Sequence, residues 1–221
     1  MTQRNELVVE PPSGRPANAC VLILHGLGAD GHDFEPLVPQ LDLPDDADVR
    51  FIMPHAPQLA VTVNNGMTMP AWYDILSMDL GRQVDTAQLD QSVERIQALI
   101  QAQIDQGIDS RRIVVAGFSQ GGAVAYQAAL TFAQPLGGLL AMSTYLANTQ
   151  ALADSTSNRA LPVEVHHGTA DPVVPESLGR DSIRALEARG YEITYRSYEM
   201  GHALCPEQLG DISRFLQARL R

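Results

Sequence analysis

Continuous apolar runs alternate with amphipathic stretches along most of this chain. Apolar runs of this kind are typical of strands buried on both faces of a sheet. The strand candidates fall at residues 21–24, 49–53, 113–116, 139–142 and 163–165, and the last candidate, residues 193–198, is rich in β-branched and aromatic residues. The stretches that predict helices are residues 85–106, 123–132, 175–190 and 206–220. Their apolar side chains recur at helical spacing, or they are rich in helix formers. The alternation predicts an α/β protein with a mostly parallel central sheet and helices on both faces.

Residues 56–84 interrupt this alternation and show no clean period. Turn-forming residues punctuate the segment at Pro57, Gly66, Pro70 and Gly81. Its apolar side chains are Leu59, Val61, Val63, Met67, Met69, Trp72, Ile75 and Met78. We interpret the segment as a long loop, and loops of this length in a compact domain are often functional. It carries more apolar surface than an idle solvent loop would.

Length and charge narrow the class of protein. The 221 residues suit one compact domain, so we expect residues 1–221 to form a single domain. The 26 acidic and 15 basic side chains give a net charge of −11. This balance argues against nucleic acid and against anionic membrane surfaces as partners, because both attract cationic proteins.

The sequence also predicts where the protein resides. No run approaches the roughly 18 apolar residues of a membrane span, so we expect no stable membrane anchor. The first twenty residues lack the continuous apolar core of a signal peptide. Cys20 and Cys205 neither form a disulfide framework nor have metal-ligand spacing. We therefore expect a cytoplasmic, reduced protein.

A serine in a glycine-rich turn is the first candidate for chemistry. Residues 117–121 read Gly-Phe-Ser-Gln-Gly, which places Ser119 between a predicted strand and a predicted helix. This is the context of a nucleophile elbow, whose turn is so sharp that side chains two residues from the serine would collide. The helix N-terminus also favours negative charge at Ser119. The pattern without its context would equally fit an ordinary N-cap serine.

A histidine and an aspartate follow in the chain order of α/β-hydrolases. His202 comes directly after the last predicted strand, and Asp171 comes after the strand at residues 163–165. Each of the three side chains follows a different strand, so all three can meet at one sheet edge. We assign His202 as the base that takes the serine proton and Asp171 as its orienter. The remaining histidines, His25, His32, His55, His166 and His167, are interpreted as structural or solvated.

Two backbone amides are predicted to stabilise a developing oxyanion. One belongs to Gln120, the residue after the nucleophile. The other is assigned to Leu27, which lies in a glycine-containing turn after the first apolar run. A metal site built from His25, His166 and His167 is disfavoured, because adjacent residues of a strand point to opposite faces. We predict no metal.

At these motifs the chain resembles the small bacterial carboxylesterases and acyl-protein thioesterases, the phospholipase/carboxylesterase family of α/β-hydrolases. The resemblance covers nearly the whole chain. Its motifs are residues 25–31 (HGLGADG), 54–57 (PHAP), 72–74 (WYD), 117–122 (GFSQGG), 167–175 (HGTADPVVP) and 201–202 (GH). The family implies an α/β-hydrolase fold without a large cap domain. It also implies a Ser119–Asp171–His202 triad, the Leu27 and Gln120 amides as the oxyanion hole, and no cofactor. Some of its members are dimers, so a homodimer stays open.

We therefore expect a serine carboxylesterase that hydrolyses short-to-medium acyl esters through an acyl-enzyme. The partner would be a small-molecule ester, and the apolar groove for its acyl chain would be lined by Met67, Met69 and Trp72. An acyl-protein thioesterase or a lysophospholipase with the same triad is one alternative. A non-catalytic binding module of the same fold is another, although the intact Ser, His, Asp and Gly set argues against it.

Overall fold

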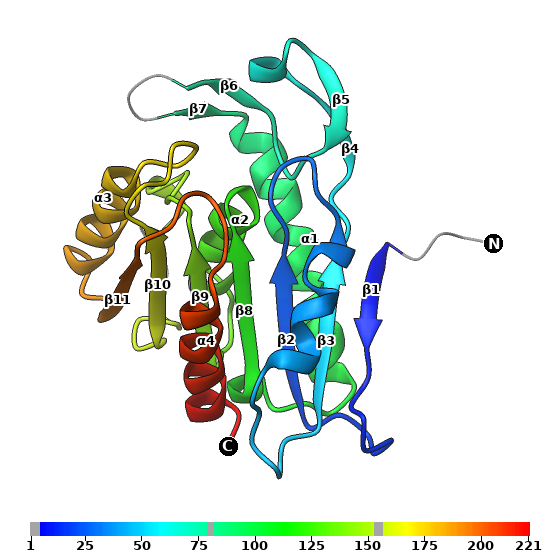
Figure 1. Cartoon of the computed structure of the whole chain (residues 1–221). Helices are drawn as coiled ribbons and strands as arrows, with labels where there is room; N and C mark the ends of the chain where they lie inside the picture. The colour runs from blue at the N-terminus through cyan, green and yellow to red at the C-terminus, as the bar shows by residue number, and fades with distance from the viewer. Residues whose placement is uncertain (1–4, 79–81, 153–156) are drawn as a thin grey trace.

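The computed structural model of this protein describes residues 5–78, 82–152 and 157–221. Its centre is a seven-stranded sheet in the order β1-β3-β2-β8-β9-β10-β11 (Figure 1). Six strands are parallel and follow closely the runs predicted from the sequence. They are β2 (Ala19–Leu24), β3 (Val49–Pro54), β8 (Ile113–Phe118), β9 (Gly138–Met142), β10 (Val163–Gly168) and β11 (Ile193–Tyr198). The seventh strand, β1 (Glu6–Val9), pairs antiparallel with β3 at the sheet edge.

Helices cover both faces of this sheet, as the sequence predicts. The helices α1 (Thr86–Asp105), α2 (Gln120–Leu130) and α3 (Glu176–Glu187) contribute to one hydrophobic core together with Cys20, Leu22 and Leu24 of β2. The helix α4 (Pro206–Arg219) packs on the other face, against the alternate β2 residues Val21 and Ile23. Both sets of β2 side chains are buried because the strand lies between the two layers.

The ends of α1 follow local rules that can be read in the sequence. Asp85 caps the helix, and its side chain accepts a hydrogen bond from the Gln88 N–H. Gly107 follows the helix with φ +99°, a conformation that glycine adopts without a steric penalty. The face between these ends buries Leu89, Val93, Ile96 and Ile100. This spacing is that of the predicted amphipathic helix.

The interpretation of residues 56–84 as an irregular loop was wrong for most of the segment. Its described part forms two antiparallel hairpins, which lie beyond the carboxyl ends of the central strands (Figure 1). The first pairs β4 (Gln58–Val61) with β5 (Met67–Pro70), and the second pairs β6 (Ile75–Ser77) with β7 (Gln83–Val84). Strands of two to four residues are too short for their period to be recognised. Gly81, one of the predicted turn residues, lies outside the described residues.

Candidate active site

Ser119 occupies a strained turn between β8 and α2. Its backbone has φ +55° and ψ −122°, in a region that residues other than glycine rarely adopt. The turn is held from the neighbouring strand, because the Ser119 N–H donates to the Met142 carbonyl at 2.9 Å. A strained serine directly before a helix N-terminus is the geometry of the nucleophile elbow that the sequence predicts.

The glycines of the elbow permit close backbone approaches. A Cβ on Gly117 would lie 2.4 Å from the Gly121 carbonyl oxygen, and a Cβ on Gly121 would lie 2.4 Å from the His25 carbonyl oxygen. Any side chain at these positions would displace backbone atoms. Both positions therefore require glycine, because α2 packs closely against the loop after β2.

The structure brings Ser119, His202 and Asp171 together. The His202 Nε2 atom lies 2.9 Å from the Ser119 Oγ, and the His202 Nδ1 atom lies 2.7 Å from the Asp171 Oδ2. The serine and aspartate are buried, whereas the imidazole keeps 16% of its surface exposed. The His202 ring also packs on Phe118, with 4.7 Å between ring centroids. A hydroxyl, an imidazole and a carboxylate in this chain of contacts can transfer the serine proton to the imidazole.

The loops that carry Asp171 and His202 are hydrogen-bonded to each other. The Ala170 N–H donates to the Met200 carbonyl at 3.1 Å, and the Thr169 N–H donates to the Tyr198 carbonyl at 2.9 Å. These bonds extend the parallel pairing of β10 and β11 beyond the ends of the strands. They fix Asp171 relative to His202 through the backbone.

His167 and Thr144 support the site from positions that the sequence does not assign to it. The Nε2 atom of the buried His167 ring lies 2.8 Å from the Val174 carbonyl oxygen, in the loop that carries Asp171. The Thr144 hydroxyl donates to the Ser119 carbonyl at 2.6 Å. Thr144 follows β9, which lies beside β8. Only the order of strands in the sheet reveals this proximity.

The loop after β2 brings Leu27 to the same edge. Gly28 has φ +80°, and its N–H donates to the Pro70 carbonyl at 2.8 Å. His25 is fully buried, and its Nε2 atom accepts a hydrogen bond from the Ala56 N–H at 3.0 Å. Burial lowers the pKa of the His25 imidazole, consistent with an accepting, unprotonated Nε2. Gln120 begins α2, where N–H groups have no partner within the helix.

The three residues predicted to contact the acyl chain differ in position. Met69 is partly buried on β5, and its sulfur lies 4.0 Å from the position that a Cβ on Gly28 would occupy. Met67 is 64% exposed, and Trp72 is only 1% exposed. Met67 shares its exposure with Leu76, Met78 and Val173, which lie in the hairpins and in the Asp171 loop. Of the three predicted residues, Met69 is therefore the one that is only partly buried and also lies close to Gly28 in the loop after β2.

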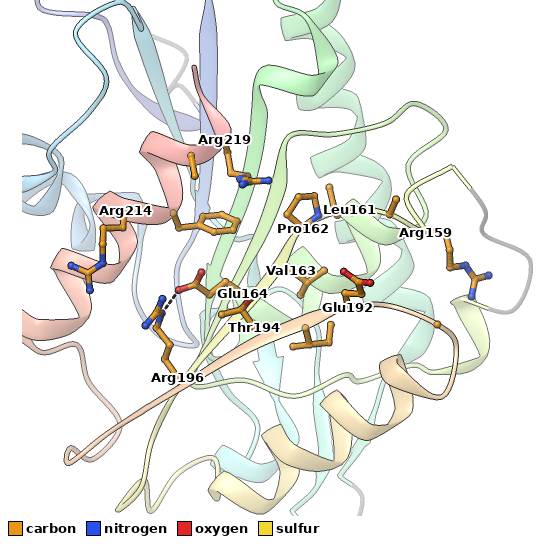
Figure 2. A pocket seen from close by; sticks show the side chains of 15 residues that line it. Arg159, Leu161, Pro162, Val163, Glu164, Glu192, Thr194, Arg196, Arg214 and Arg219 are labelled. Carbon is orange, nitrogen blue, oxygen red and sulfur yellow. Dashed lines mark hydrogen bonds and ion pairs between the residues drawn. The ribbon is translucent and has the colours of Figure 1, made fainter.

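A cavity of about 860 Å³ lies at the opposite end of the sheet, at the starts of β10 and β11. Figure 2 shows arginine side chains around it and the ion pair between Arg196 and Glu164. Arg196 and Arg214 also pair with Asp211. Arg196 and Arg214 are thus paired with carboxylates of the protein, and the cavity is remote from Ser119.

The adjacent histidines His166 and His167 contact different groups. His166 contacts Glu164 at 2.9 Å, whereas His167 contacts Val174. His32 is exposed and pairs with Glu35.

Within residues 5–78, 82–152 and 157–221, no helix is long and apolar enough to cross a bilayer.

The parallel sheet, the covering helices and the elbow together define an α/β-hydrolase of the serine-hydrolase class. Comparison with known protein families supports this class. The sequence profile of the phospholipase/carboxylesterase family matches residues 4–220, and the chain belongs to that family. The prediction that residues 1–221 form one domain stays a prediction.

Relatives with known names support the assignment to this family. The chain is 39% identical over 220 residues to "Acyl-protein thioesterase 1" of Gibberella zeae, a match that covers 95% of this chain and 94% of the relative. It is 40% identical over 229 residues to the protein of the same name in Neurospora crassa, with 97% and 94% covered.

Solved structures agree on the fold. The crystal structure of Zea mays acyl-protein thioesterase 2 matches with a TM-score of 0.85 and 26% identity, covering 98% of this chain and 99% of the other. The structure of Arabidopsis thaliana SOBER1 matches with a TM-score of 0.87 and 26% identity, covering 92% and 99%.

Proposed function

We propose that this protein hydrolyses acyl thioesters and carboxylic esters with Ser119 as nucleophile, His202 as base and Asp171 as orienter. The observation that carries the proposal is the continuous set of contacts from the Ser119 hydroxyl through the His202 ring to the Asp171 carboxylate. A serine hydroxyl is a weak nucleophile until an adjacent base removes its proton. A base that is itself held by a carboxylate has the tautomer that can do so.

The reaction follows from the positions of these groups. The Ser119 Oγ attacks the acyl carbonyl carbon while its proton passes to the His202 Nε2. The negative charge that develops on the carbonyl oxygen is stabilised by the N–H groups of Leu27 and Gln120. His202 then donates its proton to the leaving thiol or alcohol. A water molecule, deprotonated by His202, releases the acid and restores Ser119.

S-acylated proteins are the substrate class that we favour. The support is the name acyl-protein thioesterase 1 carried by relatives 39% and 40% identical over nearly the whole chain. The exposed apolar side chains Met67, Leu76 and Met78 would suit an acyl chain presented on a larger partner. Small carboxylic esters, the expectation from the sequence, pass through the same tetrahedral intermediate and would be cleaved by the same residues.

The test compares three substrates with one acyl chain: a thioester, the matched oxyester and an S-acylated peptide. We expect kcat/KM to be highest for the S-acylated peptide. Hydrolysis of the small oxyester without cleavage of the peptide would instead identify a small-ester carboxylesterase.

A second arm tests the nucleophile. A fluorophosphonate should label Ser119, as located by mass spectrometry, and Ser119→Ala should abolish labelling and lower turnover by several orders of magnitude. Ser110→Ala is the matched control, because Ser110 lies near the surface and its hydroxyl donates to the Pro135 carbonyl. Wild-type turnover in the Ser119→Ala variant would end the proposal.

A further inference from the structure

One short segment contacts both halves of the proposed oxyanion hole. Residues 70–73, here called the brace segment, begin at Pro70, the last residue of strand β5. Towards the loop after β2, the Trp72 indole N–H donates to the His25 carbonyl at 2.9 Å, and the Pro70 carbonyl accepts from the Gly28 N–H at 2.8 Å. Leu27 lies between these two attachment points in the chain.

The brace segment also contacts Gln120, the other half of the proposed oxyanion hole. The Trp72 N–H donates to the Gln120 side-chain oxygen at 2.8 Å, and the Gln120 side-chain amide donates to the Tyr73 carbonyl at 2.7 Å. Both donor and acceptor functions of the Gln120 side chain are therefore satisfied by two adjacent residues. Trp72, Tyr73 and Gln120 are all buried, so water does not compete for these two bonds.

We propose that the brace segment is a positioning element that sets the separation of the Leu27 and Gln120 amides, with Trp72 as its central residue. The inference rests on the proposed function, because it assigns a role within that oxyanion hole. An oxyanion hole works only when its donors are fixed before charge develops. The two donors come from elements far apart in the sequence, and the brace segment contacts both.

The brace segment is itself fixed from outside the site. The Ser92 hydroxyl, on α1, donates to the Trp72 carbonyl at 2.5 Å. The Ala71 N–H donates to the Pro57 carbonyl at 2.9 Å. The Trp72 ring packs on the His25 ring with 5.2 Å between centroids. A rigid support of this kind costs no reorganisation at the moment of reaction.

The test uses an alkyl trifluoromethyl ketone labelled with ¹³C at its carbonyl carbon. Ser119 Oγ adds to this carbon, the carbonyl electron pair moves to the oxygen, and the serine proton passes to His202. The ¹³C shift of the adduct, followed against pH, gives the pKa of the hemiketal hydroxyl. This pKa reports directly on the donors that stabilise the oxyanion.

Two variants loosen the brace segment without removing an oxyanion donor. Trp72→Phe deletes the indole N–H, and Gln120→Met keeps the backbone N–H while releasing the side chain. We expect each to lower kcat by roughly 10- to 100-fold with little change in KM, because misplacement of about 1 Å can cost that much. The hemiketal pKa should rise, and the inhibition constant of the ketone should increase in parallel.

Matched controls remove similar bonds elsewhere. Tyr195→Phe deletes an aromatic O–H donor to Glu176, and Gln97→Met deletes the hydrogen bond from a side-chain amide to the Ala128 carbonyl. Both should keep the wild-type kcat and hemiketal pKa. Thermal unfolding verifies that each variant is folded, and Ser92→Ala provides a third, milder perturbation should Trp72→Phe not fold.

The outcomes separate this inference from the proposed function. Failure of the wild-type protein to form the adduct would reject the proposed function. Adduct formation by the wild type, with an unchanged hemiketal pKa in folded Gln120→Met and Ser92→Ala variants, would reject the brace segment and leave the proposed function standing.

Discussion

The two carboxylate oxygens of Asp171 have different partners, and only one of them contacts His202. Oδ2 lies 2.7 Å from the His202 Nδ1, while Oδ1 accepts hydrogen bonds from the Val173 and Val174 N–H groups, both at 2.9 Å. The carboxylate is therefore held by its own loop in the position from which it contacts the imidazole. Because the side chain is buried, these bonds are not weakened by solvent.

Replacing Asp171 by Asn tests this orientation. The amide oxygen can still accept from Val173 and Val174, so the fold should be kept, but the amide N–H₂ then faces the His202 Nδ1 and favours the wrong tautomer. We expect kcat for p-nitrophenyl acetate to fall by about 10³- to 10⁴-fold. Asp48→Asn is the control, since Asp48 pairs with Ser13 and Arg15 in a distant loop. Undiminished turnover in folded Asp171→Asn would show that another group orients the base.

Packing at the elbow predicts a contrast between two glycine substitutions. In Gly121→Ala the new Cβ would meet the carbonyl oxygens of His25 at 2.4 Å and Leu24 at 2.5 Å. We expect a loss of about 3 kcal/mol or more in the free energy of unfolding, because backbone atoms must move. Gly210→Ala, in α4, meets only an Arg214 side-chain nitrogen at 3.5 Å. It should stabilise by about 0.5–1 kcal/mol. Urea unfolding of both variants measures the difference, and equal stabilities would contradict the tight contact.

Acyl-chain preference is expected to depend on Met69 more than on Met67. Met69 lies beside Gly28 of the proposed oxyanion loop, whereas Met67 is 64% exposed. Met69→Ala should lower kcat/KM for longer acyl chains relative to acetyl, by about 4-fold for each methylene group of the substrate that the shorter side chain leaves in water. A series of p-nitrophenyl esters of increasing length, measured on Met69→Ala and Met67→Ala, tests this. An unchanged chain-length profile for Met69→Ala would remove that residue from the acyl site.

Burial of His25 predicts a loss of stability in acid. Its folded-state pKa lies below the ordinary value of 6.5, chiefly because burial disfavours the charged ring. Above pH 6.5 the ring is neutral in both states. Below that pH, the unfolded chain binds a proton that the folded protein does not. The free energy of unfolding should therefore fall with decreasing pH, by at most about 1.4 kcal/mol per pH unit from this group.

Urea unfolding of wild type and His25→Gln between pH 5 and 8 measures this contribution. The slope below pH 6.5 should be shallower in the variant. His32 is the control, because its effect on stability has the opposite pH dependence. Its hydrogen bond to Glu35 raises the pKa of the His32 ring, so its contribution to the free energy of unfolding is present in acid and is lost as pH rises. His32→Asn should leave the acid-side loss in place. Identical slopes for wild type and His25→Gln would assign the loss to other groups.

The meeting of Ser119, His202 and Asp171 could be predicted because their local sequence patterns are unusual. Gly117 and Gly121 flank Ser119 at the spacing that a sharp turn requires, and His202 and Asp171 each follow a predicted strand. The ends of parallel strands meet at one sheet edge, so these positions predict an encounter without any knowledge of strand order. The distances of 2.9 and 2.7 Å agree with that expectation.

Short strands and supporting residues could not be predicted in this way. Strand β1 has four residues ahead of Pro11 and Pro12, and β7 has two, so neither displays a period. The apolar segment around Trp72 predicts a contact with substrate, yet the indole N–H of this residue is directed at the His25 carbonyl. Which partner a buried polar group finds depends on neighbours from distant parts of the chain.

The sequence by itself determined the alternation of strands and helices, the elbow around Ser119 and the order of the three catalytic candidates. These features are local, since burial period and steric crowding act over a few residues. The tertiary structure alone decided that β9 lies beside β8, that Thr144 supports Ser119 and that residues 70–73 join the loop after β2 to Gln120. Such contacts arise only when segments far apart in sequence are packed together, and each buried polar group must then bond to whatever group faces it.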